Sequence, residues 1–530
     1  MTMRYNLHYF IFFLLVFTAC EKPAKQTSKP NIIMIMADDL GYADLGCYGS
    51  EIHTPNLDRM ASEGMRMTQF YNTAKCTETR ATLLTGLYHQ QTDNLKRSDN
   101  NITIAEGLQQ AGYRTILSGK WHLGDWKAET NTPNERGFDE YFGFLAGAIN
   151  FYTGRDYGSD VNYMRRNREI YEAPSDFYST DAFTDFALEQ INLSVENNRP
   201  FFLYLAHNAP HYPLQVPDEE IEKYQGQYMI GWDSLRLRRL KRMQAMGTVD
   251  PRWELSERDS LAPAWESLSL EEQQKEQRLM ATYAGMIDRL DQQIGRLLDQ
   301  LDALDIADNT LIFFLADNGG CPYDANRSPI TSPGPASSSR TYDTEWAQVS
   351  NTPFRHYKQW IHEGGISTPM ILRWPGVIPA DTLVHTPGQL VDILPTLLDV
   401  AQVDFPDQYA DRRLLAPEGI SLLPVLRGES IQRSKPLFWE YRGSRAVREG
   451  AWKLVGQRGD GWELYNLDED RSEMYDLSED YPERVARMAA EYDTWAERVG
   501  ARNTKEAMAM PVNQQDRYLY PGEKQSVMNE

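Results

Sequence analysis

The stretch N-I-I-M-I-M-A-D-D-L-G-Y, residues 31–42, indicates the fold. Its apolar part, Asn31 to Met36, shows no polar alternation, which is typical of a β-strand buried on both faces of a parallel sheet covered by helices. The same character recurs at residues 115–117, 201–206, 310–316 and 370–374. Helical patterns lie between these runs, the clearest at 276–304, where apolar residues recur every three or four positions. This alternation predicts a large α/β domain, doubly wound, with a mostly parallel sheet flanked by helices.

Chemically active side chains follow four of these five predicted strands. In an open parallel sheet, ligands bind beyond the carboxyl ends of the strands, so the residues that follow each strand are candidates for a site. They are Asp38 and Asp39 after the first strand, Lys120 and His122 after the second, His207 and His211 after the third, and Asp317 and Asn318 after the fourth. We therefore expect one site shared by four strand ends.

Four of these side chains offer only oxygen ligands. They are Asp38, Asp39, Asp317 and Asn318. Such a set suits Ca²⁺ or Mg²⁺ and not zinc, which prefers nitrogen and sulfur ligands. Each pair alone is more typical of a turn or a helix cap. Two pairs at two strand ends, with cationic side chains close by, favour a single divalent cation, with Ca²⁺ as the first choice and Mg²⁺ as the alternative.

The composition of the chain changes near Ser434. Short strands are predicted at 436–441, 444–448, 452–455 and 462–465, with a helix at 483–498. We therefore expect a catalytic α/β domain at 31–433 and a smaller C-terminal α+β subdomain at 434–530. Two stretches of the large domain resemble insertions: residues 218–275 are highly charged and predicted to form a helical excursion on the surface, and residues 321–350 are predicted to form a long loop near the site.

The charge balance limits the partners. The 530 residues include 54 basic and 76 acidic side chains, a net charge of −22, which argues against nucleic acid because phosphate binding needs a basic stripe. A small anionic substrate remains compatible, because a few cations in a cleft can outweigh a distant net charge. Four cysteines in a chain of this length exclude a disulfide scaffold, although Cys47 and Cys321 lie where they could either pair or stay free.

The N-terminus has the features of an export signal. Residues 1–19 combine Arg4, an apolar core at 10–17 that is too short to span a bilayer, and two small residues before Cys20. This arrangement resembles a bacterial lipoprotein signal, except that Phe17 stands where leucine is usual; the alternative is an ordinary secretory peptide. With residues 20–30 as a tether, we expect an exported protein at the periplasm or cell surface, held to the outer membrane through a lipid anchor on Cys20.

The segment that indicates the function is C-T-E-T-R-A-T-L-L-T-G, residues 76–86. It resembles the signature of type I sulfatases, in which Cys or Ser, any residue, Pro or Ala, any residue and Arg precede a small residue and L-L-T-G. Further motifs follow in the order of that family: S-G-K-W-H-L-G, H-N-A-P-H, L-I-F-F-L-A-D-N-G-G and K-Q-W-I-H-E-G-G-I-S-T-P. The resemblance covers about residues 31–500, points to the arylsulfatase-like branch through S-N-T-P-F-R and E-L-Y-N-L, and implies an alkaline-phosphatase-like fold.

The resemblance also implies a mechanism. In that family a formylglycine-generating maturase oxidises the cysteine, here Cys76, to formylglycine (3-oxoalanine), an aldehyde whose hydrate attacks sulfur. The cation would be bound by Asp38, Asp39, Cys76, Asp317 and Asn318, and the catalytic set would be Cys76, Arg80, Lys120, His122, His211 and Lys358. Arg80, Lys120 and Lys358 would surround the sulfate. His122 would act as the base, and His211 would protonate the leaving group, chosen over His207 because it precedes Tyr212-Pro213 as in the family motif.

One departure from the pattern leaves alternatives open. Glu78 stands where the family has Pro or Ala, and an acidic residue there could weaken maturation. Two other interpretations of the chain remain. It could be a phosphoester hydrolase of the same superfamily, or a lipid-tethered glycan-binding relative that has lost catalysis. As a sulfatase, the protein would act on a sulfated polysaccharide fragment or an aryl sulfate, with specificity determined by residues 218–275, 321–350 and the C-terminal subdomain.

Overall fold

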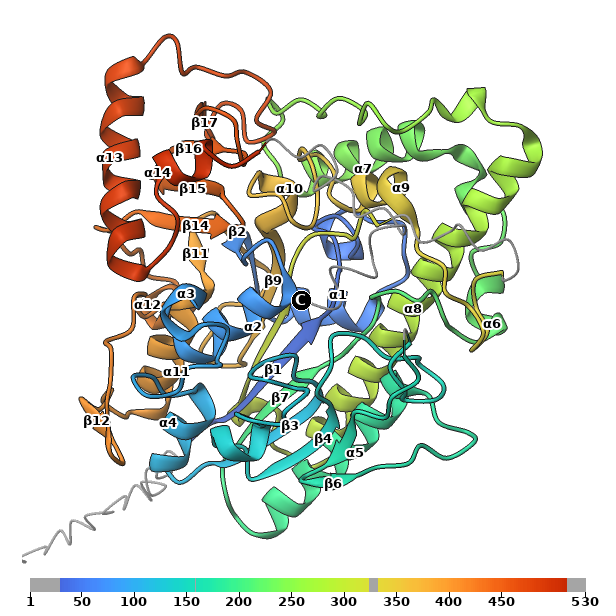
Figure 1. The fold of residues 1–530 in the computed structure, drawn as a ribbon. Coiled ribbons are helices and arrows are strands. Elements are labelled where there is room, and N and C mark those ends of the chain that lie inside the picture. The colour runs from blue at the N-terminus through green and yellow to red at the C-terminus, as the bar shows by residue number, and fades with distance from the viewer. Residues whose placement is uncertain (1–28, 158, 324–331, 512–530) are drawn as a thin grey trace, which may run out of the picture.

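The computed structural model describes residues 29–157, 159–323 and 332–511, and its centre is one large mixed sheet (Figure 1). The strands lie side by side in the order β10 (Thr382–Val384), β2 (Met65–Tyr71), β9 (Ser367–Arg373), β8 (Thr310–Ala316), β1 (Asn31–Ala37), β7 (Phe201–Ala206), β3 (Arg114–Lys120), β4 (Glu140–Phe144), β5 (Met164–Arg166) and β6 (Glu169–Ile170), and β11 (Gly388–Gln389) also pairs with β2. All five strands predicted from the sequence are present, and the predicted α/β class is confirmed.

Four of the predicted strands run parallel, with their carboxyl ends at one edge. β1 pairs with β8 up to Ala37 opposite Ala316 and with β7 up to Met36 opposite Ala206, and β3 continues this register with Gly119 opposite Ala206. The fifth, β9, is antiparallel to both β8 and β2, which makes the sheet mixed and mostly parallel, as predicted. The first residues of β9, and not its last ones, therefore lie at the edge where the four parallel strands end. This explains why no candidate metal ligand follows β9 in the sequence.

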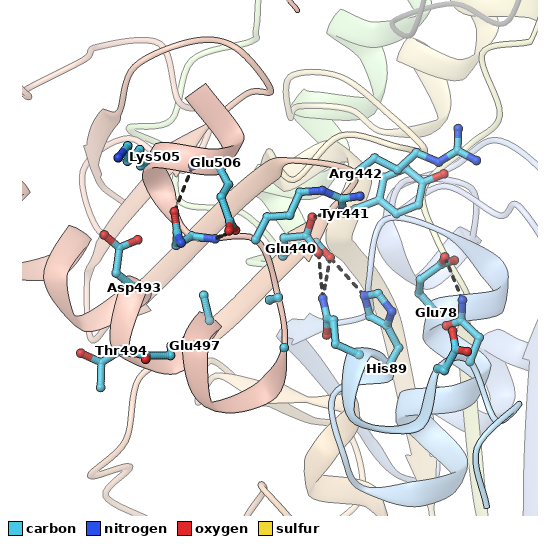
Figure 2. A pocket seen from close by; sticks show the side chains of 18 residues that line it. Glu78, His89, Glu440, Tyr441, Arg442, Asp493, Thr494, Glu497, Lys505 and Glu506 are labelled. Atoms are coloured by element: carbon cyan, nitrogen blue, oxygen red, sulfur yellow. Dashed lines mark hydrogen bonds and ion pairs between the residues drawn. The ribbon is translucent and has the colours of Figure 1, made fainter. Parts of the chain in front are cut away.

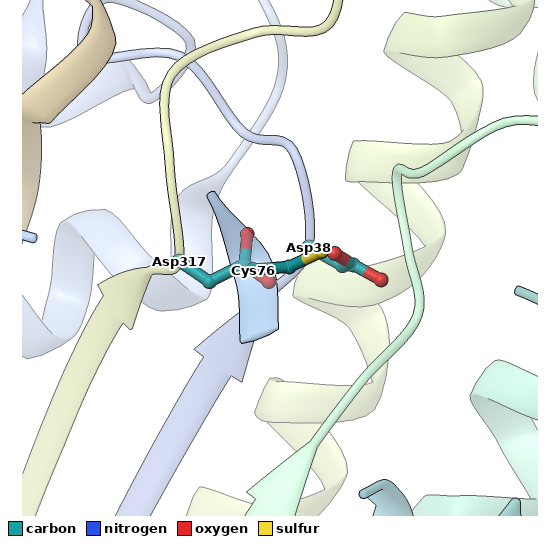
Figure 3. Close-up of side chains that lie close together, drawn as sticks. All are labelled: Asp38, Cys76 and Asp317. Carbon is teal, nitrogen blue, oxygen red and sulfur yellow. The ribbon is translucent and has the colours of Figure 1, made fainter. Parts of the chain in front are cut away.

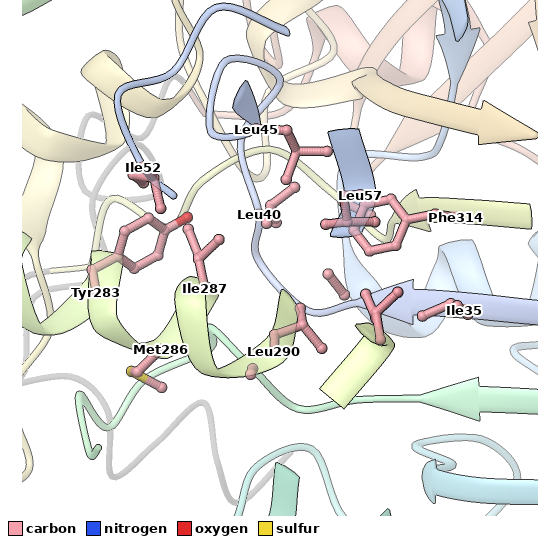
Figure 4. Close-up of a cluster of buried hydrophobic side chains, with 14 of the residues drawn as sticks. Ile35, Leu40, Leu45, Ile52, Leu57, Tyr283, Met286, Ile287, Leu290 and Phe314 are labelled. Atoms are coloured by element: carbon pink, nitrogen blue, oxygen red, sulfur yellow. The ribbon is translucent and has the colours of Figure 1, made fainter. Parts of the chain in front are cut away.

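Helices cover both faces of the sheet, and β1 has buried side chains on each face because its alternate residues point to opposite sides. Ile33 and Ile35 belong to the core beneath α1 (Pro55–Ser62), α5 (Ser179–Glu196) and α8 (Leu270–Ala303); Figure 4 shows Ile35 in the same apolar cluster as Ile287 and Leu290 of α8. Ile32 and Met34 belong to the opposite core, beneath α2 (Cys76–Thr85), α4 (Ile104–Gln110) and α11 (Ile393–Ala401). The uninterrupted apolar runs follow from this two-sided burial.

The structure adds detail to both predicted insertions. Residues 218–275 are helical, with α6 (Asp218–Glu222) and α7 (Trp232–Met246), but one side is buried: Trp232 and Trp265 lie with ring centroids 4.7 Å apart, and Arg239 pairs with Asp44 at 2.7 Å. The predicted helical excursion is present, and its buried apolar side was not visible from the charge along the segment. Of the loop predicted at 321–350, residues 324–331 lie outside the described residues, and its last part forms a buried helix, α9 (Asp343–Ser350).

The C-terminal part forms an antiparallel sheet of β14 (Leu437–Tyr441), β15 (Ser444–Glu449), β16 (Trp452–Gly456) and β17 (Glu463–Asn466). α13 (Pro482–Val499) covers one face through Met488, Tyr492 and Trp495, and the other face packs against Tyr71, Ile361 and Ile366 of the large domain. The predicted α+β subdomain is confirmed, while the boundary at residue 434 stays a prediction. Short elements complete the fold: α3 (His89–Thr92), α10 (Glu363–Ile366), α12 (Leu423–Leu426), α14 (Thr504–Met508), β12 (Gln408–Tyr409) and β13 (Arg412–Arg413).

The predicted signal peptide, Cys20 and most of the tether lie outside the described residues. Among the helices that the structure does describe, none combines the length and the apolar character that crossing a bilayer requires. Cys47 and Cys321 are buried and free, so within the described chain they do not form the disulfide that the sequence left open.

Candidate active site

Side chains from three separate segments meet at the carboxyl edge of the central sheet (Figure 3). Asp38 follows β1, Asp317 follows β8, and Cys76 is the first residue of α2. One ligand atom from each lies within 4.8 Å of the other two, and all three side chains are buried. The positions predicted from separate motifs are therefore brought together by parallel strands that share one edge.

Several side-chain oxygens of the oxygen-donor residues have no hydrogen-bond partner and are suited to bind a cation. Within the described residues, Asp38 Oδ1, Asp39 Oδ2 and Asn318 Oδ1 are buried and accept no hydrogen bond. A buried oxygen without a partner is costly, and a bound cation removes that cost. Asp317 differs, because its Oδ1 accepts from the backbone N–H of Asp39 at 3.1 Å. The unpartnered oxygens come from three of the four oxygen-donor residues predicted to bind the metal, so these residues fit a hard divalent cation such as Ca²⁺ or Mg²⁺.

Three buried cations balance the three carboxylates. Lys120 Nζ donates to Asp38 Oδ2 at 2.7 Å, and Arg80 donates to Asp317 Oδ2 at 2.9 Å. Lys358 Nζ donates to Asp39 Oδ1 at 2.5 Å, although 319 residues separate the two in the chain. Each side chain is at most about 1% exposed, so these pairs lie in a region of low dielectric where charge interactions are strong.

The electrostatic balance differs among the carboxylates. Burial, and then the neighbouring charge of Asp317, raise the pKa of Asp38 well above its usual value. Burial also acts to raise the pKa of Asp39, but His211 and Lys358 outweigh it and lower that pKa. One of the crowded acids thus tends to hold a proton, a tendency that a bound divalent cation would oppose.

Comparison with known proteins shows which family the chain belongs to. A family model described as Sulfatase matches residues 30–403, and a second, N-sulphoglucosamine sulphohydrolase, C-terminal, matches residues 354–494. The chain belongs to the sulfatase family. Enzymes of this family are sulfuric ester hydrolases, and the predicted family and enzyme class are confirmed.

Two curated relatives and one solved structure illustrate the similarity. This sulfatase is 34% identical to the arylsulfatase of Klebsiella aerogenes, covering 76% of this chain and 93% of the relative, and 33% identical to an uncharacterized sulfatase of Schizosaccharomyces pombe, covering 81% and 86%. The crystal structure of Ps i-CgsB in complex with k-i-k-neocarrahexaose shares 26% identity at a TM-score of 0.66, covering 92% of this chain and 96% of that chain. The predicted alkaline-phosphatase-like fold is confirmed through these structural neighbours.

His122 lies against Cys76 in this sulfatase. Its Nδ1 atom is 3.5 Å from Cys76 Sγ, and the Thr77 hydroxyl lies 3.3 Å from each ring nitrogen. Burial, followed by the charges of Lys120 and Arg80, lowers the pKa of His122 well below 6.5. The imidazole is therefore neutral near pH 7 and has a nitrogen able to accept a proton.

The two histidines that follow β7 have different surroundings. His211 Nε2 lies 3.4 Å from Asp39 Oδ2, and burial lowers the pKa of His211 to about 3 despite that carboxylate. His207 is fully buried, and within the described chain neither of its ring nitrogens has a hydrogen-bond partner. The structure thus places His211, and not His207, beside the acidic cluster.

Two residues at this site of the sulfatase were missed from the sequence. Tyr323 is buried, and its ring lies 5.2 Å from Lys75 Nζ and 5.4 Å from Lys358 Nζ. The position of Lys75 directly before Cys76 was a usable signal. Tyr323 gave none, because its contact with Lys75 joins residues 248 positions apart.

A separate cavity of about 1150 Å³, with Glu78 among its lining residues, lies between the α2–α3 region and the C-terminal subdomain (Figure 2). Its acidic lining residues are Glu78, Asp93, Glu440, Asp493, Glu497 and Glu506, and its basic ones are Arg442, Arg502 and Lys505. Glu78 Oε1 accepts only a long hydrogen bond, from Asn94 Nδ2 at 3.4 Å. The residue that departs from the family pattern therefore borders this acidic cavity.

Proposed function

We propose that this sulfatase releases inorganic sulfate from organic sulfate esters with formylglycine, made from Cys76 by a maturase, as its nucleophile. The observation that carries the proposal is the meeting of Cys76 with the carboxylates of Asp38 and Asp317 within 4.8 Å. An aldehyde at this position supplies, as its hydrate, a hydroxyl for attack on sulfur.

A single divalent cation, Ca²⁺ before Mg²⁺, would be held by Asp38, Asp39, Asp317, Asn318 and the side chain at position 76. The cation would neutralise charge on the sulfate and lower the pKa of the attacking hydroxyl. The unpartnered oxygens of Asp38, Asp39 and Asn318 support this assignment.

Arg80, Lys120 and Lys358 provide the positive charge that the anionic ester needs. Their donor atoms already lie against the carboxylates of the cluster, so they need little reorganisation to face an incoming sulfate. These cations orient the ester for in-line attack from position 76.

The two histidines take opposite proton-transfer roles. His122, neutral and 3.5 Å from Cys76 Sγ, accepts a proton at Nδ1 from a hydroxyl at position 76. His211 protonates the leaving oxygen, with Lys358 nearby as a second donor. A bound sulfate brings negative charge toward His211 and so favours its protonated form.

The substrate class we propose is a sulfated carbohydrate, with aryl sulfates as the alternative. Tyr157 and Tyr212 are only partly buried, with ring centroids 5.7 Å apart, and such aromatic rings offer an apolar face to a sugar. The similar structure that contains k-i-k-neocarrahexaose supports the carbohydrate, and the Klebsiella arylsulfatase supports the aryl ester.

Mass spectrometry of the peptide containing residue 76, after expression with a maturase, tests the nucleophile. Aldehyde at position 76, with sulfate released from a panel of sulfated oligosaccharides and aryl sulfates and none released by Cys76→Ala, supports the proposal. An intact thiol favours the glycan-binding alternative, which Glu78 would explain. Faster cleavage of an aryl phosphate than of the matching aryl sulfate favours the phosphoester hydrolase.

We also propose that residues 1–19 direct export and that Cys20 carries a lipid at the outer membrane. The apolar run before Cys20 supports this proposal. Labelled fatty acid incorporated by the wild type and not by Cys20→Ala tests it, and equal labelling of both contradicts the anchor.

A further inference from the structure

Lys75 is the one cation next to the nucleophile position whose charge is not matched within the described residues. Its side chain is partly buried, and its Nζ donates to the hydroxyl of Tyr323 at 2.8 Å. No carboxylate of the described chain pairs with it, whereas Arg80, Lys120 and Lys358 each pair with one. An ammonium group has three donors, so two of those on Lys75 are available to a ligand.

Tyr323 strengthens this donor site. Its hydroxyl oxygen accepts from Lys75 Nζ and also from Gln359 Nε2 at 2.7 Å. Two incoming donors use both lone pairs of a phenol oxygen, so its own O–H points elsewhere and has no acceptor in the described chain. The phenolic proton and the ammonium protons together form a site for an oxygen acceptor that carries negative charge.

This donor site lies on the leaving-group side of the reaction centre. The ring of Tyr323 is flanked by Lys75 and Lys358, and it contacts the ring of Tyr212 with centroids 5.9 Å apart. Tyr212 in turn stacks on His211, which we assign to the leaving oxygen, at 4.3 Å. A group attached to the leaving alcohol would therefore reach Lys75 and Tyr323 while its sulfate occupies the cation cluster.

We propose that Lys75, with the Tyr323 hydroxyl, binds a second anionic group on the alcohol part of the substrate. The inference rests on the proposed function and narrows it to saccharide sulfates that carry a further sulfate or a carboxylate near the ester that is cleaved. The acidic cavity that Glu78 lines repels such an anion, so the attraction of Lys75 decides where it binds.

The test uses oligosaccharide sulfates that share one cleavable ester and differ in one neighbouring group: a hydroxyl, a second sulfate or a carboxylate. kcat/KM is measured for the wild type, Lys75→Met, Lys75→Arg and Tyr323→Phe, each divided by its aldehyde content from mass spectrometry, because position 75 adjoins the maturation site. Lys241→Met, an exposed lysine on α7, is the matched control for a lost charge.

In Lys75→Met, the preference for the anionic over the hydroxyl substrate falls at least about ten-fold, as expected for one lost charge-assisted hydrogen bond. Lys75→Arg and Lys241→Met keep the preference, and Tyr323→Phe lowers it by a smaller factor. Comparing kcat/KM for the substrate with a second sulfate and for the one with a carboxylate shows which anion Lys75 recognises. Equal loss on all substrates in Lys75→Met, or no preference in the wild type, overturns the inference.

A binding measurement separates this inference from the proposed function. Calorimetry with Cys76→Ala compares the affinity of the hydroxyl and anionic substrates, with and without Lys75→Met. If the wild type releases no sulfate, the proposed function fails, yet a Lys75-dependent preference in binding still supports the anion site. Binding that does not depend on Lys75 contradicts the site even in an active enzyme.

Discussion

His122 Nδ1 lies 3.5 Å from the Sγ atom of Cys76, with Lys120 holding Asp38 behind it. The distance joins the proposed base to the proposed nucleophile position across 46 residues of sequence. Because the charges of Lys120 and Arg80 and the burial of the ring keep its pKa low, His122 can take up a proton but does not hold one at rest.

Replacing His122 by Ala removes that base. We expect kcat to fall by about 10²- to 10⁴-fold, the usual contribution of a positioned general base, with the aldehyde content of residue 76 unchanged. Single-turnover sulfate release and mass spectrometry measure the two quantities. A variant that retains full turnover would rule out this role.

His211 and His207 form a matched pair after β7. His211→Ala should slow esters with poor leaving groups far more than an activated aryl sulfate, because only the former need a proton on the departing oxygen. His207→Ala should change both rates alike, since His207 contacts none of the clustered carboxylates in the described chain. A leaving-group dependence seen in His207→Ala would reverse the assignment.

Removal of the divalent cation should abolish activity and lower Tm. A ligand present at 100 times its Kd stabilises the folded state by about 2.7 kcal/mol, so chelation followed by Ca²⁺ or Mg²⁺ addition gives a measurable shift in Tm. The shift should be lost in Asn318→Leu, which deletes one unpartnered oxygen. If chelated and Ca²⁺-loaded protein melt together, the cluster binds no cation.

Glu363 joins the two parts of the fold through a buried ion network. Its carboxylate accepts from Lys453 at 2.9 Å and from Arg471 at 2.7 Å, all fully buried. Glu363→Gln removes the carboxylate that Arg471 and Lys453 share; Lys453 keeps Glu473 at 2.8 Å, but the buried charge left on Arg471 should still cost about 3 kcal/mol of unfolding free energy. Denaturant unfolding measures it, and Glu271→Gln, which removes an exposed partner of Lys275, should leave the midpoint unchanged.

Asp291 lies away from the active site and should make the stability of the fold depend on pH. It accepts the backbone N–H groups of Asn56 and Leu57 at the start of α1, and burial raises its pKa to about 6. Between about pH 4 and 6 the folded state keeps a proton that the unfolded chain releases, so stability falls as pH rises through this window.

Asp291→Asn does not titrate there. The stability of the wild type relative to this variant should therefore drop by roughly 3 kcal/mol from pH 4 to pH 7, about two pKa units. Thermal melts of both proteins across that range measure the difference, and parallel Tm curves would contradict the raised pKa.

Much of the site was predictable because parallel strands share an edge. The apolar runs identified β1, β3, β7 and β8, and the residues after them, from Asp38 to Asn318, meet at one edge, except His207. The direction of β9 was not predictable, since an apolar run looks the same in either direction. Lys358 reaches Asp39 because β9 starts at the site edge, which only strand pairing decides.

By itself the sequence determined the strands, the long helix α8, the C-terminal α+β unit and the type of chemistry at residues 76–86. These follow from local periodicity and from side chains placed at element ends. Tertiary structure alone decided that Cys47 and Cys321 are unpaired, that Lys358 pairs with Asp39, and that Lys75 donates a hydrogen bond to Tyr323. The physical reason is that such contacts join segments far apart in the chain, and packing of the whole sheet and its helices fixes their distances.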